Sequence, residues 1–435
     1  MAGTGGAPRL LRYLSLLGMQ APFLLGLGLL AFAGCASADF KVADSTDGAA
    51  DSSGDTALDT RPDALADVNC PSLGATDEII VDSNSIAATP NGTSACPFRT
   101  IREGLAITVA GTPRLVRVKG TVGGRVYNET TSLVVKTGVT LLSDGLGNVV
   151  ITGSGGSCAG AGTTCMVQVN RGANLDGFIV QGSTANVTLV SISGAGAGGV
   201  GPASVKNTRA TKAVGDGAFA FLVNDGAVLG PNVESLQNPA VAGLQIYGSS
   251  PVRVTGSNTR FNNNLWGINH EGGGSLTIEG GVAANLNAKS GVRIFTALGV
   301  MHTISALTAG GNAEAGLAVV GGSVTVRGSF LNADNKVGVA LNGAPGVTLD
   351  LGTATTGGNN LFGTTAGAVN RNKYAGVCVE GLTVELKIAG NRWTTCPPSN
   401  ANLAGSCADV PGEYKDVILR GAPGGTVTAS GCTPG

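Results

Sequence analysis

Charged and aromatic residues are both scarce in this chain of 435 residues, at 13% and 4%. Histidine occurs only twice and no CxxC motif is present, so a zinc site made of clustered thiols and imidazoles is not expected. Apart from a leader and an acidic stretch, the chain is only slightly basic, which excludes a strong nucleic-acid footprint. Glycine is abundant, with 71 residues, but no strict triplet exists, so the chain is not collagen-like.

The glycines mark a sequence repeat between residues 242 and 393. Each repeat contains a glycine, alternating apolar residues, a turn, a second alternating run and then asparagines. Six glycines begin the repeats, at spacings of 24, 24, 25, 22 and 38 residues: Gly243, Gly267, Gly291, Gly316, Gly338 and Gly376. A period in the twenties is typical of solenoids, in which each unit buries its apolar face only by stacking on its neighbours.

Alternation with a period of two predicts strands that have one inward face. A first strand follows each glycine, and second strands are expected at 252–254, 276–278, 324–326, 347–351 and 384–386. Asparagines suit the tight bend before the next glycine, and equivalent bends on stacked coils are expected to form asparagine ladders. Each repeat is therefore predicted to be one coil of a parallel β-helix. The 38-residue step is interpreted as one coil with an inserted loop, and two coils are the alternative.

The first 34 residues have the features of a secretory signal. Arg9 and Arg12 precede an apolar run that ends in the sequence FAGC at residues 32–35. A cysteine in this place resembles the lipobox of bacterial lipoproteins, whose cysteine is acylated and becomes the mature N-terminus. The resemblance implies lipidation of Cys35, and we expect an exported lipoprotein held in a lipid membrane, at the outer membrane or cell surface. An uncleaved membrane anchor is the alternative.

Residues 35–69 form a segment of different composition. Ala, Ser, Thr and Gly dominate it, together with eight aspartates. Such a segment cannot bury enough apolar surface to fold, so we predict a solvated tether. Calcium binding by the aspartates is the alternative, but no turn glycine or bidentate glutamate defines a site.

Eight cysteines remain besides Cys35, and an even number in an exported chain predicts four disulfides. The first four are close enough in sequence to form local pairs, whereas the last four allow three connectivities. The expected pairs are Cys70 with Cys96, Cys158 with Cys165, Cys396 with Cys407 and Cys378 with Cys432. Residues 396–435 are then expected to close the C-terminal end of the solenoid.

Residues 78–155 carry a more specific resemblance. The sequence GTSACPFRTI at residues 92–101 is followed by a predicted helix, Arg102–Ala110, and by a predicted strand at 138–141. This arrangement resembles the N-terminal domain of unknown function in bacterial β-helix lipoproteins of the pectate-lyase-like superfamily. With the repeats, the resemblance covers residues 78 to about 393. It implies an all-β fold, a right-handed single-stranded parallel β-helix over residues 70–395, whose N-terminal mouth is capped by the short helix.

The residue sets of sugar-cleaving β-helix enzymes are not found in the sequence. Polygalacturonase-like enzymes carry a DD pair, a GHG and an RIK, but the chain has no DD or GHG, and residues 293–295 read RIF. Two carboxylates are needed for glycoside hydrolysis, and the outward row two residues after each glycine contains none. His270 occupies a position that is apolar in the other coils, so we predict an interior histidine and not a base.

A stripe across three successive coils is the best candidate for a site. It comprises the residues two and four positions after Gly243, Gly267 and Gly291: Gln245, Tyr247, Asn269, Glu271, Arg293 and Phe295. Flat aromatic faces beside planar hydrogen-bonding groups suit an extended sugar chain. The alternative is a solvated strand face without a ligand.

These observations predict a surface-anchored β-helix lipoprotein that acts as a non-enzymatic binding or structural module. Extracellular polysaccharide is the candidate partner, besides the lipid membrane that would hold Cys35. The alternative function is a polysaccharide lyase or glycoside hydrolase with a divergent active site. We expect no cofactor, no metal and no nucleic acid, and we expect a monomer.

Overall fold

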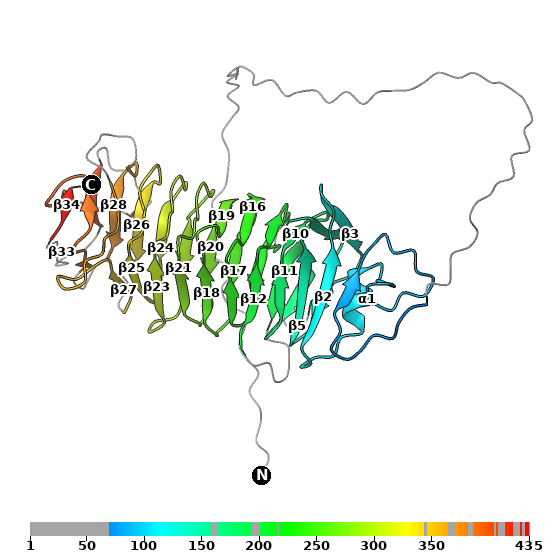
Figure 1. The fold of residues 1–435 in the computed structure, drawn as a ribbon. Coiled ribbons are helices and arrows are strands. Elements are labelled where there is room, and N and C mark those ends of the chain that lie inside the picture. The colour runs from blue at the N-terminus through cyan, green and yellow to red at the C-terminus, as the bar shows by residue number, and fades with distance from the viewer. Residues whose placement is uncertain are drawn as a thin grey trace, which may run out of the picture. The chain divides into compact units, whose positions relative to one another are not determined.

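The protein is a parallel β-helix, as the repeat predicts, and it is right-handed, as the resemblance of residues 78–155 implies (Figure 1). The computed structural model describes residues 69–434, except 146, 159–162, 194–200, 216, 343–345, 364–370, 382–385, 404–405, 408–413, 421–426 and 429–430. The predicted signal, Cys35 and the tether up to residue 68 lie outside the described residues. Three parallel sheets form the sides of the helix, and a short pair, β30 (Arg392–Trp393) and β34 (Thr433–Pro434), lies beside them.

We call the sheets A, B and C. Sheets A and C run along the whole stack, whereas sheet B ends at β19 and continues only as single bridges between the later coils. Sheet A contains β1 (Ile79–Val81), β2 (Arg114–Lys119), β5 (Val139–Asp144), β9 (Asn174–Asp176), β12 (Ala203–Lys206), β15 (Ala227–Leu229), β18 (Val252–Thr255), β21 (Leu276–Glu279), β23 (Met301–Ser305), β25 (Ser323–Arg327), β27 (Thr348–Asp350), β29 (Leu386–Lys387) and β33 (Val427–Thr428). Sheet B contains β3 (Arg125–Glu129), β6 (Val149–Gly153), β10 (Phe178–Gln181), β13 (Arg209–Thr211), β16 (Glu234–Asn238) and β19 (Arg260–Asn264). Sheet C contains β4 (Leu133–Val135), β7 (Gly156–Ser157), β8 (Thr164–Asn170), β11 (Val187–Ser193), β14 (Phe221–Val223), β17 (Leu244–Ile246), β20 (Ile268–His270), β22 (Val292–Ile294), β24 (Ala315–Val319), β26 (Val337–Asn342), β28 (Ala375–Glu380), β31 (Asn400–Leu403) and β32 (Lys415–Arg420).

Rows of apolar side chains run through the interior, because strands of adjacent coils pair without a shift in register. One such row consists of the residues directly after the repeat glycines: Leu244, Ile268, Val292, Leu317, Val339 and Val377. All six are 0% exposed. Small aliphatic side chains in such rows fill a narrow interior, which explains how the chain folds with few aromatic residues.

The long step between the last two glycines is one coil with an inserted loop, as interpreted from the sequence. β26 pairs directly with β28, with Val339 opposite Val377, so no strand of sheet C lies between them. The additional residues are divided among the bends of this coil, because Leu341, Asp350, Leu361 and Asn372 are more widely spaced than their counterparts Val319, Thr325, Phe330 and Asn335. An insertion at a bend leaves the strand registers unchanged, so the stack tolerates it.

A ladder of buried asparagines occupies the bend between sheets B and C, as expected. The amide oxygen of Asn312 accepts from the backbone N–H and the side-chain amide of Asn287, at 3.0 and 2.9 Å. Asn312 in turn donates to Asn335 at 2.9 Å, and Asn335 donates to Asn372 at 3.0 Å. Each rung thus satisfies polar groups of the next coil in a place that water does not reach.

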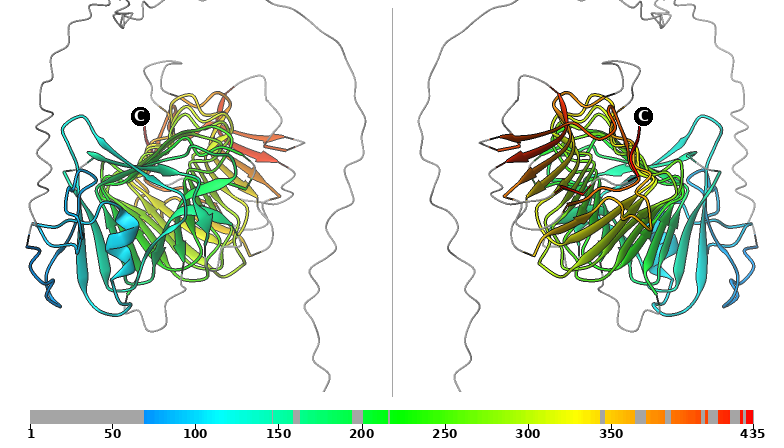
Figure 2. Two further views of the ribbon diagram at one scale, coloured as in Figure 1. Left: turned by 90° about the vertical axis from the view of Figure 1, so that its right-hand side faces the viewer. Right: turned by 90° about the vertical axis from the view of Figure 1, so that its left-hand side faces the viewer.

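The capping helix is shorter than predicted: α1 spans Ile101–Ala106, not Arg102–Ala110. Thr100 and Glu103 form a capping box at its beginning, and Ile107 is its C-cap. At the C-terminal end of α1, the Lys136 ammonium donates to the carbonyls of Leu105 and Thr108, at 3.2 and 2.6 Å, and so satisfies acceptors there. In the end-on views of Figure 2 the coils lie over one another, and Figure 1 shows α1 at the N-terminal end of the stack.

Four disulfides are present, and two of the expected pairs are wrong. Cys70–Cys96 and Cys158–Cys165 form as predicted. The other bonds are Cys378–Cys407 and Cys396–Cys432, in place of Cys396–Cys407 and Cys378–Cys432.

The physical reason for the different pairing lies in the last coil. Cys378 faces outward from β28 in register with Ile418 and packs in a small apolar cluster with Ala340 and Leu403. Cys407 packs against the same cluster, and its backbone N–H donates to Glu380. Cys396 instead follows β30, and Cys432 directly precedes its partner strand β34. Proximity in space therefore overrides proximity in sequence.

No helix in the described ranges is long and apolar enough to span a membrane. Within these ranges, β31 is the last strand of sheet C and covers the edge of β32. The role of residues 396–435 as a closing segment stays a prediction.

Candidate functional site

The predicted stripe is centred on three polar side chains that lie in register on sheet C. Gln245, Asn269 and Arg293 are neighbours on β17, β20 and β22. The Asn269 amide donates to Gln245 Oε1 at 2.8 Å, and Asn269 Oδ1 accepts from Arg293 at 3.0 Å. A chain of hydrogen bonds therefore joins three coils across the face of the sheet, which orients all three planar groups.

Glu271 completes this network from the position after β20. Its carboxylate accepts from Arg293 at 2.6 Å and from the Asn269 amide at 3.1 Å. The side chains of Arg293 and Glu271 are 26% and 30% exposed, so the ion pair is partly open to solvent. Burial and the nearby Glu271 charge both raise the pKa of Tyr247. Tyr247 therefore remains a neutral phenol over the physiological range, with a proton to donate.

Two aromatic rings of the stripe are exposed. Tyr247 is 47% and Phe295 is 49% exposed. The chain of hydrogen bonds links the coil that carries Tyr247 to the coil that carries Phe295. The guanidinium carbon of Arg293 lies 5.2 Å from the Phe295 ring centroid. Phe219 packs edge-on against Tyr247 at 6.1 Å, which fixes the tyrosine ring from the preceding coil. An exposed ring held in one orientation can stack on a ligand with little loss of side-chain entropy.

The centre of the stripe is less exposed than the sequence predicts. Gln245 and Asn269 are only 1% and 3% exposed, whereas the sequence placed both on an outward surface. The strand alternation correctly points both side chains out of the helix interior. Each is enclosed because it lies between neighbouring side chains of its row at the spacing of adjacent strands, about 4.8 Å.

Trp266 and Lys289 belong to the same region, and sequence reasoning missed both. The Lys289 ammonium lies 4.7 Å from the Trp266 ring centroid, and the Arg293 guanidinium lies 5.9 Å from it. The sequence could have singled out Trp266, because the residue directly before the repeat glycine is small or aliphatic in the other coils. A tryptophan at this position is therefore an exception to the repeat.

His270 is an interior residue, as the repeat pattern predicts. Its Nδ1 accepts from the Gly272 N–H at 3.1 Å, so Nε2 carries the proton and donates to the Gly274 carbonyl at 2.8 Å. Burial lowers the pKa of His270. Both ring nitrogens are occupied inside the helix, which leaves neither for a substrate.

His302 packs edge-on against His270, with ring centroids 5.2 Å apart. Its Nδ1 accepts from the Leu276 N–H at 3.1 Å, and its Nε2 lies 3.0 Å from the Thr296 hydroxyl. Burial, and the neighbouring His270, lower the pKa of His302 to about 4. Both histidines are therefore neutral structural residues at pH 7. No group of three or more His, Cys, Asp or Glu side chains among the described residues could hold a metal ion.

The architecture defines the class of this protein as a parallel β-helix. No family model and no curated protein matches the sequence. Similar solved structures include the A-module of mannuronan C-5 epimerase AlgE6 from Azotobacter vinelandii, at 14% identity, with 77% of this chain and 94% of that chain covered and a TM-score of 0.40. The Dettilon tailspike protein has 13% identity, coverage of 78% and 67%, and a TM-score of 0.44. Pectate lyase Pel9A has 13% identity, coverage of 83% and 80%, and a TM-score of 0.31. At these identities the likeness concerns the fold alone.

Proposed function

We propose that the protein is a surface-anchored lipoprotein that binds an extended polysaccharide along the stripe without cleaving it. The observation that supports this most is the hydrogen-bonded chain from Gln245 through Asn269 to Arg293, with an exposed ring beside each end. A pyranose ring has apolar faces and polar edges. Tyr247 and Phe295 would stack on the faces, while Arg293 and Glu271 would bind the edges.

The arrangement of carboxylates favours binding over hydrolysis. Glu271 is the single carboxylate among the stripe residues, and it forms an ion pair with Arg293. Glycoside hydrolysis requires two carboxyl groups that flank the scissile bond, one of them protonated. The nearby His270 is sealed in the interior by its two hydrogen bonds. A divergent lyase or hydrolase remains the alternative, and turnover experiments distinguish it.

Replacing both Tyr247 and Phe295 with alanine is expected to abolish polysaccharide binding. The two rings are exposed, so their loss should change the free energy of unfolding by less than about 0.5 kcal/mol each. The measurement is a binding isotherm for a polysaccharide identified on a glycan array, with full-length wild type and double variant compared.

The exposed aliphatic residue Val122 on a distant turn offers a control, since Val122→Ala should not alter binding. Unchanged affinity in the double variant would remove the stripe from consideration. Cleavage of the glycan by wild type and its loss in Glu271→Gln would instead favour an enzyme.

Export and lipidation form the second part of the proposal. Four disulfides indicate an extracellular or otherwise exported protein, because such bonds persist in oxidising compartments. The FAGC sequence and the resemblance of residues 78–155 to β-helix lipoproteins support acylation of Cys35. A tether of about 34 residues would then reach on the order of 100 Å from the membrane.

We expect the mature protein to begin at an acylated Cys35 and to fractionate with membranes. Mass spectrometry of the N-terminal peptide from the native host measures both cleavage and acyl mass. Cys35→Ser should prevent acylation and release the protein from the membrane fraction. An unmodified mature N-terminus at any other residue would contradict this prediction.

A further inference from the structure

An open groove of about 380 Å³ lies on sheet B, on a different side of the helix from the stripe. Residues of the successive strands β10, β13, β16 and β19 line it. Its long direction therefore crosses the strands, parallel to the axis of the β-helix. From this groove we infer a second glycan site, which binds an extended polysaccharide that carries carboxylates, such as a polyuronate.

Charged side chains form one wall of the groove. Arg209, Glu234 and Arg260 lie directly opposite one another on β13, β16 and β19. Arg209 donates to Glu234 at 2.6 Å, and their side chains are 48% and 17% exposed. The exposed Arg260 has no ion pair with any residue that the structure describes. Two guanidinium groups thus face one carboxylate, and the row retains a positive charge.

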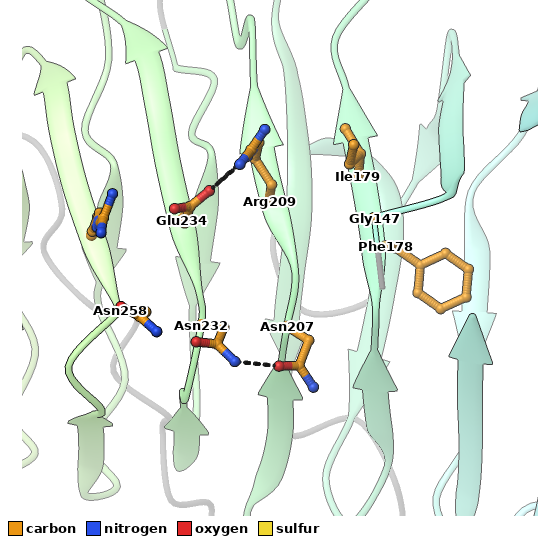
Figure 3. A pocket seen from close by; sticks show the side chains of 9 residues that line it. Gly147, Phe178, Ile179, Asn207, Arg209, Asn232, Glu234 and Asn258 are labelled. Carbon is orange, nitrogen blue, oxygen red and sulfur yellow. Dashed lines mark hydrogen bonds and ion pairs between the residues drawn. The ribbon is translucent and has the colours of Figure 1, made fainter. Parts of the chain in front are cut away.

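Asparagine side chains form a parallel shelf one bend earlier in each coil. Asn232 donates to Asn207 at 2.7 Å, and Asn207 donates to Asp176 at 2.6 Å. Figure 3 shows the hydrogen bond between Asn232 and Asn207 beneath the ion pair of Arg209 and Glu234, with Asn258 next along the shelf. Asn207 and Asn232 have φ values of 47° and 58°, a backbone conformation that asparagine tolerates.

Apolar side chains limit the polar part of the groove at both ends. On one side the charged row continues into Ile179, then Val150 and the exposed Val126. On the other side it continues into Ala283. The polar segment is therefore three coils long, with hydrogen-bonding groups repeated at about 4.8 Å. Aliphatic side chains at its ends can contact the apolar faces of sugar rings.

The residue types favour an acidic polysaccharide over other ligands. Arg260 can bind a carboxylate with two parallel hydrogen bonds, and no protein carboxylate among the described residues forms an ion pair with it. The amides and Glu234 can donate to and accept from sugar hydroxyls. A neutral glycan would provide no anionic partner for Arg260. A purely acidic peptide would provide no hydroxyl groups to hydrogen-bond with the asparagine amides. This site is independent of the stripe.

The test is binding of a short oligogalacturonate to the full-length protein, measured by titration calorimetry. Arg260→Gln is expected to weaken binding by about tenfold or more, because a hydrogen-bonded charge pair is lost. The same substitution should not change binding of the carboxyl-reduced, neutral oligosaccharide. Asn232→Gly retains the backbone conformation but removes the amide, so it should weaken binding of both ligands.

Two controls distinguish this groove from general charge attraction and from the stripe. Arg253 on sheet A has a more exposed side chain than Arg209 and is paired with Glu279, so Arg253→Gln should leave oligogalacturonate binding unchanged. The Tyr247 and Phe295 double variant should also bind oligogalacturonate normally, whatever becomes of the stripe. Equal losses in the Arg253 and Arg260 variants would overturn the inference. Equally tight binding of poly-glutamate, or no binding of oligogalacturonate and oligomannuronate by wild type, would do the same.

Discussion

Replacing Asn312 with alanine is expected to lower the free energy of unfolding by about 3 kcal/mol or more. The Asn312 side chain is fully buried, and it bonds to the coils on both sides. Its loss removes the acceptor of the Asn287 N–H and the donor to the Ala284 carbonyl, both at 3.0 Å. Water cannot replace these bonds inside the bend, so the freed polar groups bear the full cost of desolvation.

Chemical unfolding of the full-length protein measures this effect. Asn342→Ala is the matched control, because Asn342 lies exposed at the end of β26 and should change stability by less than about 0.5 kcal/mol. Similar midpoints for wild type and Asn312→Ala would show that the ladder contributes little to stability. A loss confined to the Asn312 variant would show that the ladder holds neighbouring coils together.

Acidification from pH 7 to pH 4 is expected to destabilise the fold through His302 by about 3 kcal/mol. The ordinary pKa of histidine is 6.5, and that of His302 in the folded protein is about 4. The unfolded chain therefore binds a proton first as the pH falls. The stabilising contribution is complete above 6.5 and is lost progressively between 6.5 and 4. The lowered pKa of His270 acts in the same direction.

His302→Gln isolates this contribution, because glutamine has hydrogen-bonding groups but does not titrate in this range. We expect the variant to be less stable than wild type at pH 7 and to lose less stability on acidification. Unfolding curves across the pH range measure both quantities. Parallel pH profiles for wild type and variant would contradict the prediction. Carboxylates such as Asp416, whose pKa is lowered, affect both proteins alike.

The architecture could be predicted because every coil repeats the same local pattern. A glycine, an alternating strand and an asparagine bend recur, so an ambiguous coil is interpreted correctly from its neighbours. The same comparison placed His270 in the interior, since its position is Ile246 and Ile294 in the adjacent coils. Position within the repeat also aligned Gln245, Asn269 and Arg293 on one face.

Features that depend on departures from the repeat could not be predicted. The last two disulfides depend on where Cys396, Cys407 and Cys432 lie after the final repeat, and no repeat specifies those positions. The groove on sheet B lies mainly in coils before residue 242, where the glycine pattern is weak. The sequence therefore did not reveal that Arg209 and Glu234 lie opposite each other on adjacent strands. Burial at the centre of the stripe also escaped prediction, since alternation gives the direction of a side chain but not its surroundings.

Because the register between coils is constant, the number of coils in a binding row determines the length of ligand that the row can contact. Each strand adds one position, about 4.8 Å from the last, to the outward rows of its sheet, and both the stripe on sheet C and the groove on sheet B are built in this way. Duplication or deletion of a whole coil would therefore change the length of the bound ligand by one step. The contacts made to each sugar unit would stay the same. The longer coil between β26 and β28 leaves this spacing intact, because the two strands pair directly. Evolution can thus adjust chain-length preference and contact chemistry separately on one scaffold.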